Sequence, residues 1–150
     1  MREIKYIVIH CTGTRKETTR KSIENNWKNE LGWEKPGYHC MIDQFGVNHI
    51  LSDVEHIVNG VKGCNRNSIH VAYIGGINEF GENACTLTMK QSQALQSVLK
   101  SLKIRYPNAE IVGHRDLSFD KNKDGKITPD EWEKVCPCFD VERFLTAYNI

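Results

Sequence analysis

Short runs of apolar and β-branched residues, separated by polar turns, recur along the chain and predict buried strands. One run covers residues 4–9 and ends at His10. A later run covers residues 110–113 and ends at His114. Two of the predicted strands therefore deliver a histidine at their carboxyl ends, where functional residues often lie.

Three further runs predict the rest of a sheet. Residues 38–43 and 47–51 flank a short connection that contains Gly46, and a glycine can take the positive φ that a hairpin loop requires. Residues 69–74 form another apolar run, which ends at a pair of glycines. We therefore expect one hairpin and one additional buried strand.

Apolar residues three or four positions apart predict three amphipathic helices. The positions are Ile23, Trp27 and Leu31 in the first helix, Leu95, Val98, Leu99, Leu102 and Tyr106 in the second, and Val141, Phe144, Leu145 and Tyr148 in the third. Thr88 and Gln91 form a possible capping box ahead of the second helix, and Asp140 could cap the third.

Strands interleaved with helices are typical of a mixed α/β fold, in which helices flank a central β-sheet. The 150 residues are enough to bury one hydrophobic core, and no repeat, low-complexity tract or linker divides the chain. We therefore expect a single domain over residues 1–150, present as a monomer.

The composition indicates a soluble globular protein. Hydrophobic residues make up 39% and charged residues 26%, and the formal net charge is +1, which gives no electrostatic argument for binding nucleic acid. No apolar stretch approaches the roughly 20 residues that a transmembrane helix needs. The amino-terminal residues also lack the features of a secretory signal, so we expect cytoplasmic synthesis without a signal peptide.

Six cysteines offer thiol chemistry. They are Cys11, Cys40, Cys64, Cys85, Cys136 and Cys138. Free thiols or metal ligands are expected rather than three disulfides, because cytoplasmic thiols are kept reduced. Cys136 and Cys138 are also too close in sequence for an easy mutual bridge.

Histidine and cysteine together suggest a zinc hydrolase site. Such a site needs two or three imidazole or thiolate ligands and one open position, where water is activated to attack a carbonyl. His10 and His114 would meet if their strands were adjacent, and Cys136 or Cys138 could complete the set. An isolated histidine at a strand end is more often structural, so only the combination points to a metal.

A second metal is predicted between His114 and Cys136. Residues 120–131 match a twelve-residue EF-hand calcium loop, with a glycine at its sixth position. The expected ligands are Asp120, Asn122, Asp124, the backbone carbonyl of Lys126, Thr128 and Glu131. Only residues 129–135, on its downstream side, resemble a helix start, so we expect a lone structural Ca²⁺ loop. The alternative is a polar surface turn with chance acidic spacing.

Five phrases resemble one known family over nearly the whole chain. They are IVIHCT at 7–12, GYH at 37–39, VKGCNRNSI at 61–69, GHRD at 113–116 and CPCFD at 136–140. Together they resemble the type 2 N-acetylmuramoyl-L-alanine amidases, a superfamily that includes phage lysozyme-type zinc amidases and peptidoglycan recognition proteins. The resemblance implies hydrolysis of the amide bond between N-acetylmuramic acid and L-alanine in bacterial peptidoglycan.

The resemblance also implies roles for individual residues. It assigns zinc binding to His10, His114 and Cys136, with Cys138 at a variable position of the family motif. It implies that Tyr38 and Lys134 stabilise the reaction intermediate. In the same way it places Lys62 and Asn65 among the substrate-binding residues; His39, next to Tyr38, is expected to be structural.

The chain departs from the family pattern at one position, and two alternative functions remain open. The family commonly carries a histidine two residues before the lysine of its VKG phrase, where this chain has Gly60. A peptidoglycan-binding module without activity is the main alternative, although such relatives lack the zinc cysteine. A structural zinc protein, closed by Cys136 and Cys138 together, is the other. An active enzyme would reach the cell wall after release or export by an unidentified route.

Overall fold

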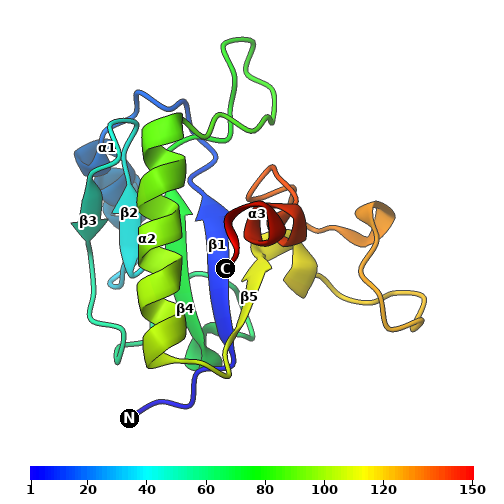
Figure 1. The fold of residues 1–150 in the computed structure, drawn as a ribbon. Helices are drawn as coiled ribbons and strands as arrows, with labels where there is room; N and C mark the ends of the chain where they lie inside the picture. Colours follow the sequence, from blue (N-terminus) through cyan, green and yellow to red (C-terminus); the bar gives the residue numbers. More distant parts are fainter.

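A five-stranded mixed β-sheet forms the centre of the computed structural model, which describes residues 1–150 (Figure 1). The strands are β1 (Tyr6–Cys11), β2 (Cys40–Ile42), β3 (Asn48–Ile50), β4 (Ser68–Tyr73) and β5 (Glu110–Gly113). Their order in the sheet is β3-β2-β4-β1-β5. Only β3 runs antiparallel to its neighbour, across the expected hairpin with Gly46 at φ +83°.

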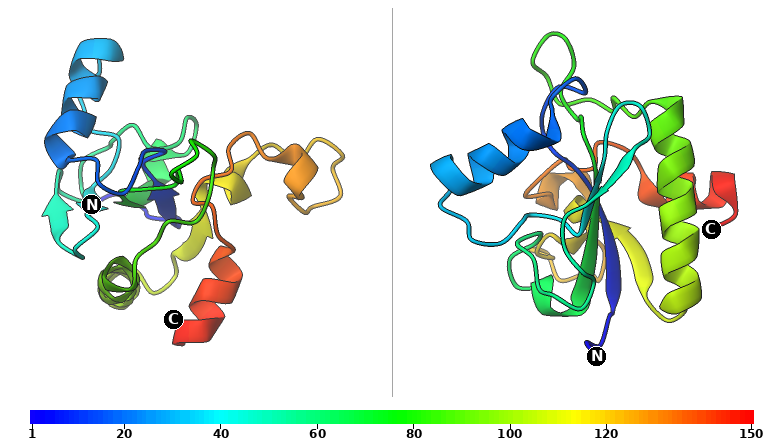
Figure 2. Two further views of the ribbon diagram at one scale, coloured as in Figure 1. Left: turned by 90° about the horizontal axis from the view of Figure 1, so that it is seen from above. Right: turned by 90° about the vertical axis from the view of Figure 1, so that its left-hand side faces the viewer.

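Helices cover both faces of the sheet, which confirms the predicted α/β class. The helices are α1 (Arg20–Asn25), which continues as a π-helical turn (Asn26–Glu30), α2 (Met89–Arg105) and α3 (Val141–Tyr148). Seen from above, α2 and α3 lie on one side of the sheet and α1 on the other (Figure 2). None of these helices has the length and apolar character needed to cross a membrane.

The core explains the continuous apolar runs of the central strands. Ile7 and Ile9 face α2 and α3, where they pack with Leu95 and Leu99. Val8 points to the opposite face and packs in a separate apolar cluster. A strand of a parallel sheet covered on both faces is apolar at successive positions, and this is why β1 shows no alternation. The face that bears Val8 also bears His10.

Three details of the expected fold are wrong. Tyr38 precedes β2 instead of lying in it. Leu31 was expected on the buried face of the first helix, but it is 51% exposed because it caps the final turn. The helix expected over residues 129–135 is only a 3₁₀ turn, Pro129–Glu131, because Trp132 leaves it with an extended backbone.

The capping box of α2 forms as expected and ties the helix to the sheet. Thr88 Oγ1 accepts from Gln91 N at 3.1 Å, and Gln91 Oε1 accepts from Thr88 N at 2.9 Å. Gln91 is fully buried, and its Nε2 donates to the carbonyl of Ile42, the last residue of β2, and to that of Ile74, the residue after β4. The amino-terminal turn of α2 therefore holds two strand ends in place.

Replacing Thr88 with alanine should lower the free energy of unfolding by about 1 kcal/mol, because the cap of α2 is lost. Urea denaturation monitored by circular dichroism measures the change. Ser97→Ala is the matched control on the exposed surface of the same helix and should change stability by less than about 0.5 kcal/mol. Equal stability of Thr88→Ala and wild type would contradict the assigned capping role.

Candidate functional site

The parallel pairing of β1 with β5 brings two histidines together. Ile9 is paired with Gly113, so the residues that follow, His10 and His114, lie side by side. Their ring centroids are 5.0 Å apart. His10 is in β1, one residue before its end, and His114 begins the short 3₁₀ turn that follows β5. Both histidines thus lie at the carboxyl edge of the sheet, where ligands of α/β proteins usually bind.

Cys136 reaches the same edge from the carboxy-terminal loop. Arg115 N donates to Cys136 O at 2.9 Å, and the buried hydroxyl of Tyr73 donates to Pro137 O at 2.8 Å. Gly113 permits this approach, because a Cβ there would lie 2.8 Å from Pro137 Cδ. These contacts fix the loop against the ends of β4 and β5.

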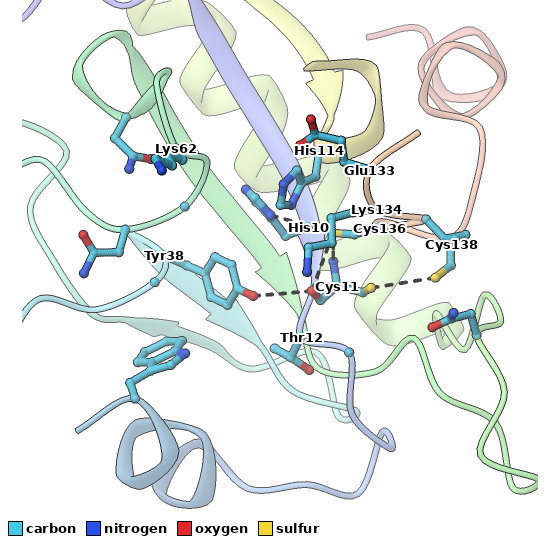
Figure 3. A pocket seen from close by; sticks show the side chains of 18 of the residues that line it. His10, Cys11, Thr12, Tyr38, Lys62, His114, Glu133, Lys134, Cys136 and Cys138 are labelled. Carbon is cyan, nitrogen blue, oxygen red and sulfur yellow. Dashed lines mark hydrogen bonds between the residues drawn. The ribbon is translucent and has the colours of Figure 1, made fainter. Parts of the chain in front are cut away.

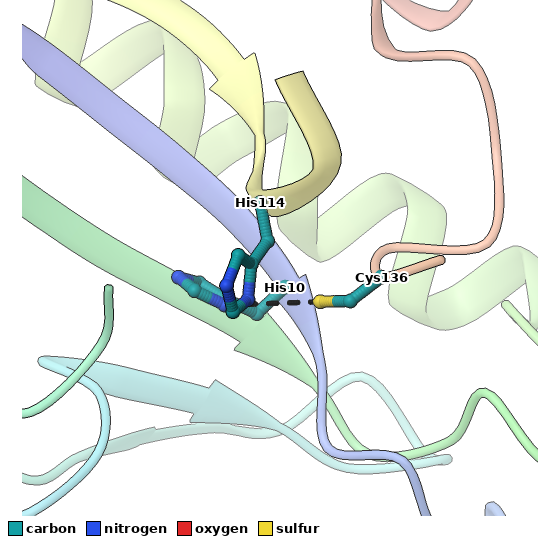
Figure 4. Close-up of side chains that lie close together, drawn as sticks. All are labelled: His10, His114 and Cys136. Atoms are coloured by element: carbon teal, nitrogen blue, oxygen red, sulfur yellow. Dashed lines mark hydrogen bonds between the residues drawn. The ribbon is translucent and has the colours of Figure 1, made fainter. Parts of the chain in front are cut away.

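The ligand atoms of His10, His114 and Cys136 all lie within 4.8 Å of one another (Figure 4). His10 Nδ1 is 3.7 Å from Cys136 Sγ. Two imidazoles and a thiolate are a typical donor set for Zn²⁺ in a catalytic site, with a fourth position left for water or substrate. The structure therefore gathers the three residues that the sequence analysis selected, and their chemistry fits zinc.

Cys138 does not belong to this group. Its Sγ faces Cys11 Sγ at 3.8 Å, whereas Cys136 Sγ accepts from Cys11 N at 3.2 Å (Figure 3). Cys138 has a positive φ, 68°, and its thiol also donates to Gly76 O at 3.8 Å. The geometry thus separates the two cysteines, which the residue pattern alone left open.

Burial keeps the histidines of the site neutral. Desolvation, followed by the effects of His70 and His114, holds the pKa of His10 well below its usual value of 6.5. Desolvation and the nearby Lys134 likewise lower the pKa of His114. A neutral imidazole has the free lone pair that a metal requires, so the environment favours metal binding.

A second pair of histidines lies behind His10. His70 Nδ1 is 3.0 Å from His10 Nε2, and the His70 ring stacks on His39 with centroids 5.9 Å apart. His39 Nδ1 accepts from His70 N, and its Nε2 lies 3.0 Å from His56 O. His39 is buried and uses both ring nitrogens within the fold. The sequence analysis missed His70, because a single polar residue in an otherwise apolar strand gave no sign of its partner.

A cleft of about 1020 Å³ opens in front of His10, His114 and Cys136 (Figure 3). The residues expected to act on substrate line it: Tyr38, Lys62, Asn65 and Lys134. Figure 3 shows Lys62 on one side and Lys134 on the other. Three lining residues were not foreseen in this role, namely Trp27, Trp33 and Glu133. The two tryptophans stack with centroids 6.4 Å apart and give the cleft an aromatic wall.

Tyr38 lies next to His10 and Cys11. Its ring centroid is 5.0 Å from that of His10, and its hydroxyl donates to Cys11 O at 3.4 Å. Burial, followed by the neighbouring Cys136 and Cys11, raises the pKa of Tyr38 above its usual value. The hydroxyl therefore remains a hydrogen-bond donor at neutral pH.

The predicted calcium loop forms a tightly hydrogen-bonded turn. Asp120 accepts from the backbone N–H groups of Lys123 and Gly125, and the buried Glu131 accepts from those of Lys121 and Thr128. Gly125 has the positive φ, 82°, expected at the sixth position. The carboxylates of the loop are not gathered within 4.8 Å of one another, unlike the ligand atoms of His10, His114 and Cys136.

Comparison with known proteins agrees with this geometry. The model of the family described as "N-acetylmuramoyl-L-alanine amidase" matches residues 1–137. The chain belongs to this amidase family. The endolysin of Klebsiella phage KP32 is 32% identical over 144 residues, which are 95% of this chain and 85% of that protein.

Two solved structures share the fold. The Ph2119 endolysin from the Thermus scotoductus MAT2119 bacteriophage superimposes with a TM-score of 0.76 at 20% identity, covering 97% of this chain and 85% of that one. The amidase LysC from Clostridium intestinale URNW has a TM-score of 0.75 at 21% identity, covering 99% and 87%. The amidase fold thus extends over nearly the full described chain.

Serine at position 136 should weaken zinc binding by more than about 100-fold, because a ligand is lost. Serine at position 138 should leave the affinity nearly unchanged. Competition with a chromogenic chelator measures both dissociation constants. Weaker zinc binding in Cys138→Ser than in Cys136→Ser would show that the assigned cysteine is wrong.

Proposed function

We propose that the protein is a zinc-dependent N-acetylmuramoyl-L-alanine amidase, which hydrolyses the amide bond between N-acetylmuramic acid and L-alanine of peptidoglycan. The observation that carries the proposal is the convergence of His10, His114 and Cys136 at the head of an open cleft. Family membership and the endolysin relative support this choice of bond.

His10, His114 and Cys136 would hold the zinc, which would supply a Lewis acid for the carbonyl and lower the pKa of a bound water to near neutral. Side chains of the protein would stabilise the charge that develops during the reaction. Hydrolysis places negative charge on the carbonyl oxygen, and donors aimed at that oxygen lower the barrier by a few kcal/mol. Tyr38 supplies a hydroxyl and Lys134 an ammonium group on the wall of the same cleft.

Lys62 and Asn65 are proposed to bind the substrate. Asn65 Oδ1 accepts from Val61 N at 2.7 Å and so shapes the loop that carries Lys62. The exposed ammonium of Lys62 offers a charged partner for a carboxylate of the stem peptide. This loop lies across the cleft from Lys134, so a bound peptide would lie between two positive charges.

The two alternatives fit the site less well. A binding module without activity needs neither a third ligand nor Tyr38 and Lys134 in the cleft, and this chain has all of them. A closed structural zinc site would need a fourth protein ligand, and Cys138 is turned toward Cys11 instead. An exchangeable zinc site for catalysis remains the better interpretation.

We also propose that residues 120–131 bind a structural Ca²⁺. The twelve-residue pattern and the positive φ of Gly125 support this assignment. The loop lies between His114 and Cys136, so its order affects the positions of Lys134 and Cys136.

We propose that the enzyme meets its substrate at the cell wall, after release or export from the cytoplasm.

Phenylalanine at position 38 and methionine at position 134 should each lower kcat by about 100-fold, because a donor to the developing negative charge is removed. Mass spectrometry of the peptides released from purified peptidoglycan measures the rate, and these peptides should begin with L-alanine. Lys100→Met is the control for an exposed lysine on α2, far from the cleft. Full activity in the Tyr38 and Lys134 variants, or activity after zinc is removed, would contradict the proposed mechanism.

Calcium should raise the melting temperature of the zinc-loaded protein, because a ligand at 100 times its Kd stabilises the folded state by about 2.7 kcal/mol. Glu131→Gln should abolish the shift by removing the bidentate carboxylate. Asp130→Asn, at the neighbouring exposed position, should keep it. An unchanged melting temperature of the wild-type protein in calcium would show that the segment is only a polar turn.

A further inference from the structure

We infer that His70 is a positioning residue for the metal site. Its Nδ1 accepts a hydrogen bond from His10 Nε2–H, and this bond holds His10 in the tautomer whose Nδ1 is free for the metal. The inference rests on the proposed zinc function and goes beyond it, because neither the family resemblance nor the sequence pattern gives His70 a role.

The orientation of His10 is the first support. Its Nδ1 faces Cys136 Sγ at 3.7 Å, and its Nε2 faces His70 Nδ1 at 3.0 Å. A neutral imidazole carries one proton, on one nitrogen only. With the proton on Nε2, Nδ1 presents a lone pair to the metal; with the proton on Nδ1, the ligand position is blocked. An acceptor opposite Nε2 therefore selects the binding form.

The burial of His70 is the second support. His70 has 0% exposure, and the only hydrogen bond of its imidazole ring is the one with His10. Its other ring nitrogen, Nε2, is buried without a partner. Burying a polar atom without a partner costs free energy, about 1–3 kcal/mol, so an apolar residue would suit the core better. The hydrogen bond with His10 is therefore the one interaction that favours a histidine over an apolar residue at position 70.

The sheet holds His70 rigidly in this position. His70 is paired with Val8 across the parallel β1–β4 register, so it lies two pairs before His10 and on the same face of the sheet. His39 fixes it from the other side: His70 N donates to His39 Nδ1, His70 O accepts from His39 N, and the rings stack at an interplanar angle of 12°. A ring fixed on both sides can in turn orient His10.

Gly60 provides the space for the His70 ring. A Cβ at position 60 would lie 2.3 Å from His70 Cγ and Nδ1. Position 60 is the one at which the amidase family commonly has a histidine. A side chain at position 60 and an imidazole at position 70 exclude each other sterically. This clash gives a physical cause for Gly60, the position where the chain departs from the family motif. The imidazole of this chain comes from β4 instead.

The test compares His70→Leu with His70→Asn, whose Oδ1 can replace Nδ1 as the acceptor. Zinc affinity is measured by chelator competition, and the ligand field by the absorption spectrum of the Co²⁺-substituted protein. His70→Leu should bind zinc about 10–100-fold more weakly and show an altered Co²⁺ spectrum. His70→Asn should recover most of the affinity and the wild-type spectrum. His49→Leu, the same exchange on β3 away from the site, should match wild type.

The melting temperature of each zinc-free variant separates a loss of folding from a loss of metal affinity. If His70→Leu does not fold, ¹⁵N NMR of the zinc-loaded wild type decides the question. A proton on His10 Nε2 with Nδ1 bound to metal supports the inference, and binding through Nε2 overturns it. Wild-type zinc affinity in a folded His70→Leu also overturns it while leaving the amidase proposal intact. A wild-type protein that does not bind zinc overturns both.

Discussion

The parallel register of β1 with its two neighbours determines the rest of the site. Pairing with β5 places His10 beside His114, and pairing with β4 places His70 behind His10. Successive residues of a strand point to opposite faces, so a slip of one residue would turn His10 into the apolar core under α2. The buried residues Ile7 and Ile9 prevent such a slip, because they must stay on the face that α2 and α3 cover. The register of β1 thus determines both the packing of the core and the position of the histidines at the carboxyl edge of the sheet.

The remaining parts of the site attach to this edge. Glycine at 113 lets the loop of Cys136 lie close to β5, and glycine at 60 lets the ring of His70 fill the space behind His10. In each case the missing side chain is what permits a functional group to approach. A methyl group at either position would collide with its neighbour at 2.8 Å or less, so both approaches depend on the absence of a side chain.

The sequence predicted the parts of this arrangement that depend on local patterns. Apolar runs located the strand that contains His10 and the strand that His114 directly follows, and the capping box located the start of α2. Features that depend on tertiary packing could not be found in this way. The choice of Cys136 over Cys138 depends on the path of a loop, so the residue pattern left it open and only the family resemblance selected Cys136. The pairing of His70 with His10 depends on strand order. Periodicity also failed at Leu31, because it does not show where a helix ends.

The long segment between His114 and Cys136 is the least regular part of the site and supplies two of its groups. Segments longer than about 12–15 residues without regular structure are uncommon, and ordering each residue costs about 1–2 kcal/mol. Here the cost is offset locally by the hydrogen bonds of Glu131 and by Arg115, whose guanidinium carbon lies 4.0 Å from the ring centroid of Trp132. Lys134 and Cys136 follow directly after these anchors. Of the three proposed ligands, His10 lies in β1 and His114 follows directly after β5, so both are held by the sheet. Cys136 and Lys134 depend instead on how well this segment is ordered. A cation bound in the loop would therefore act on the site through the order of the chain and not through contact with substrate.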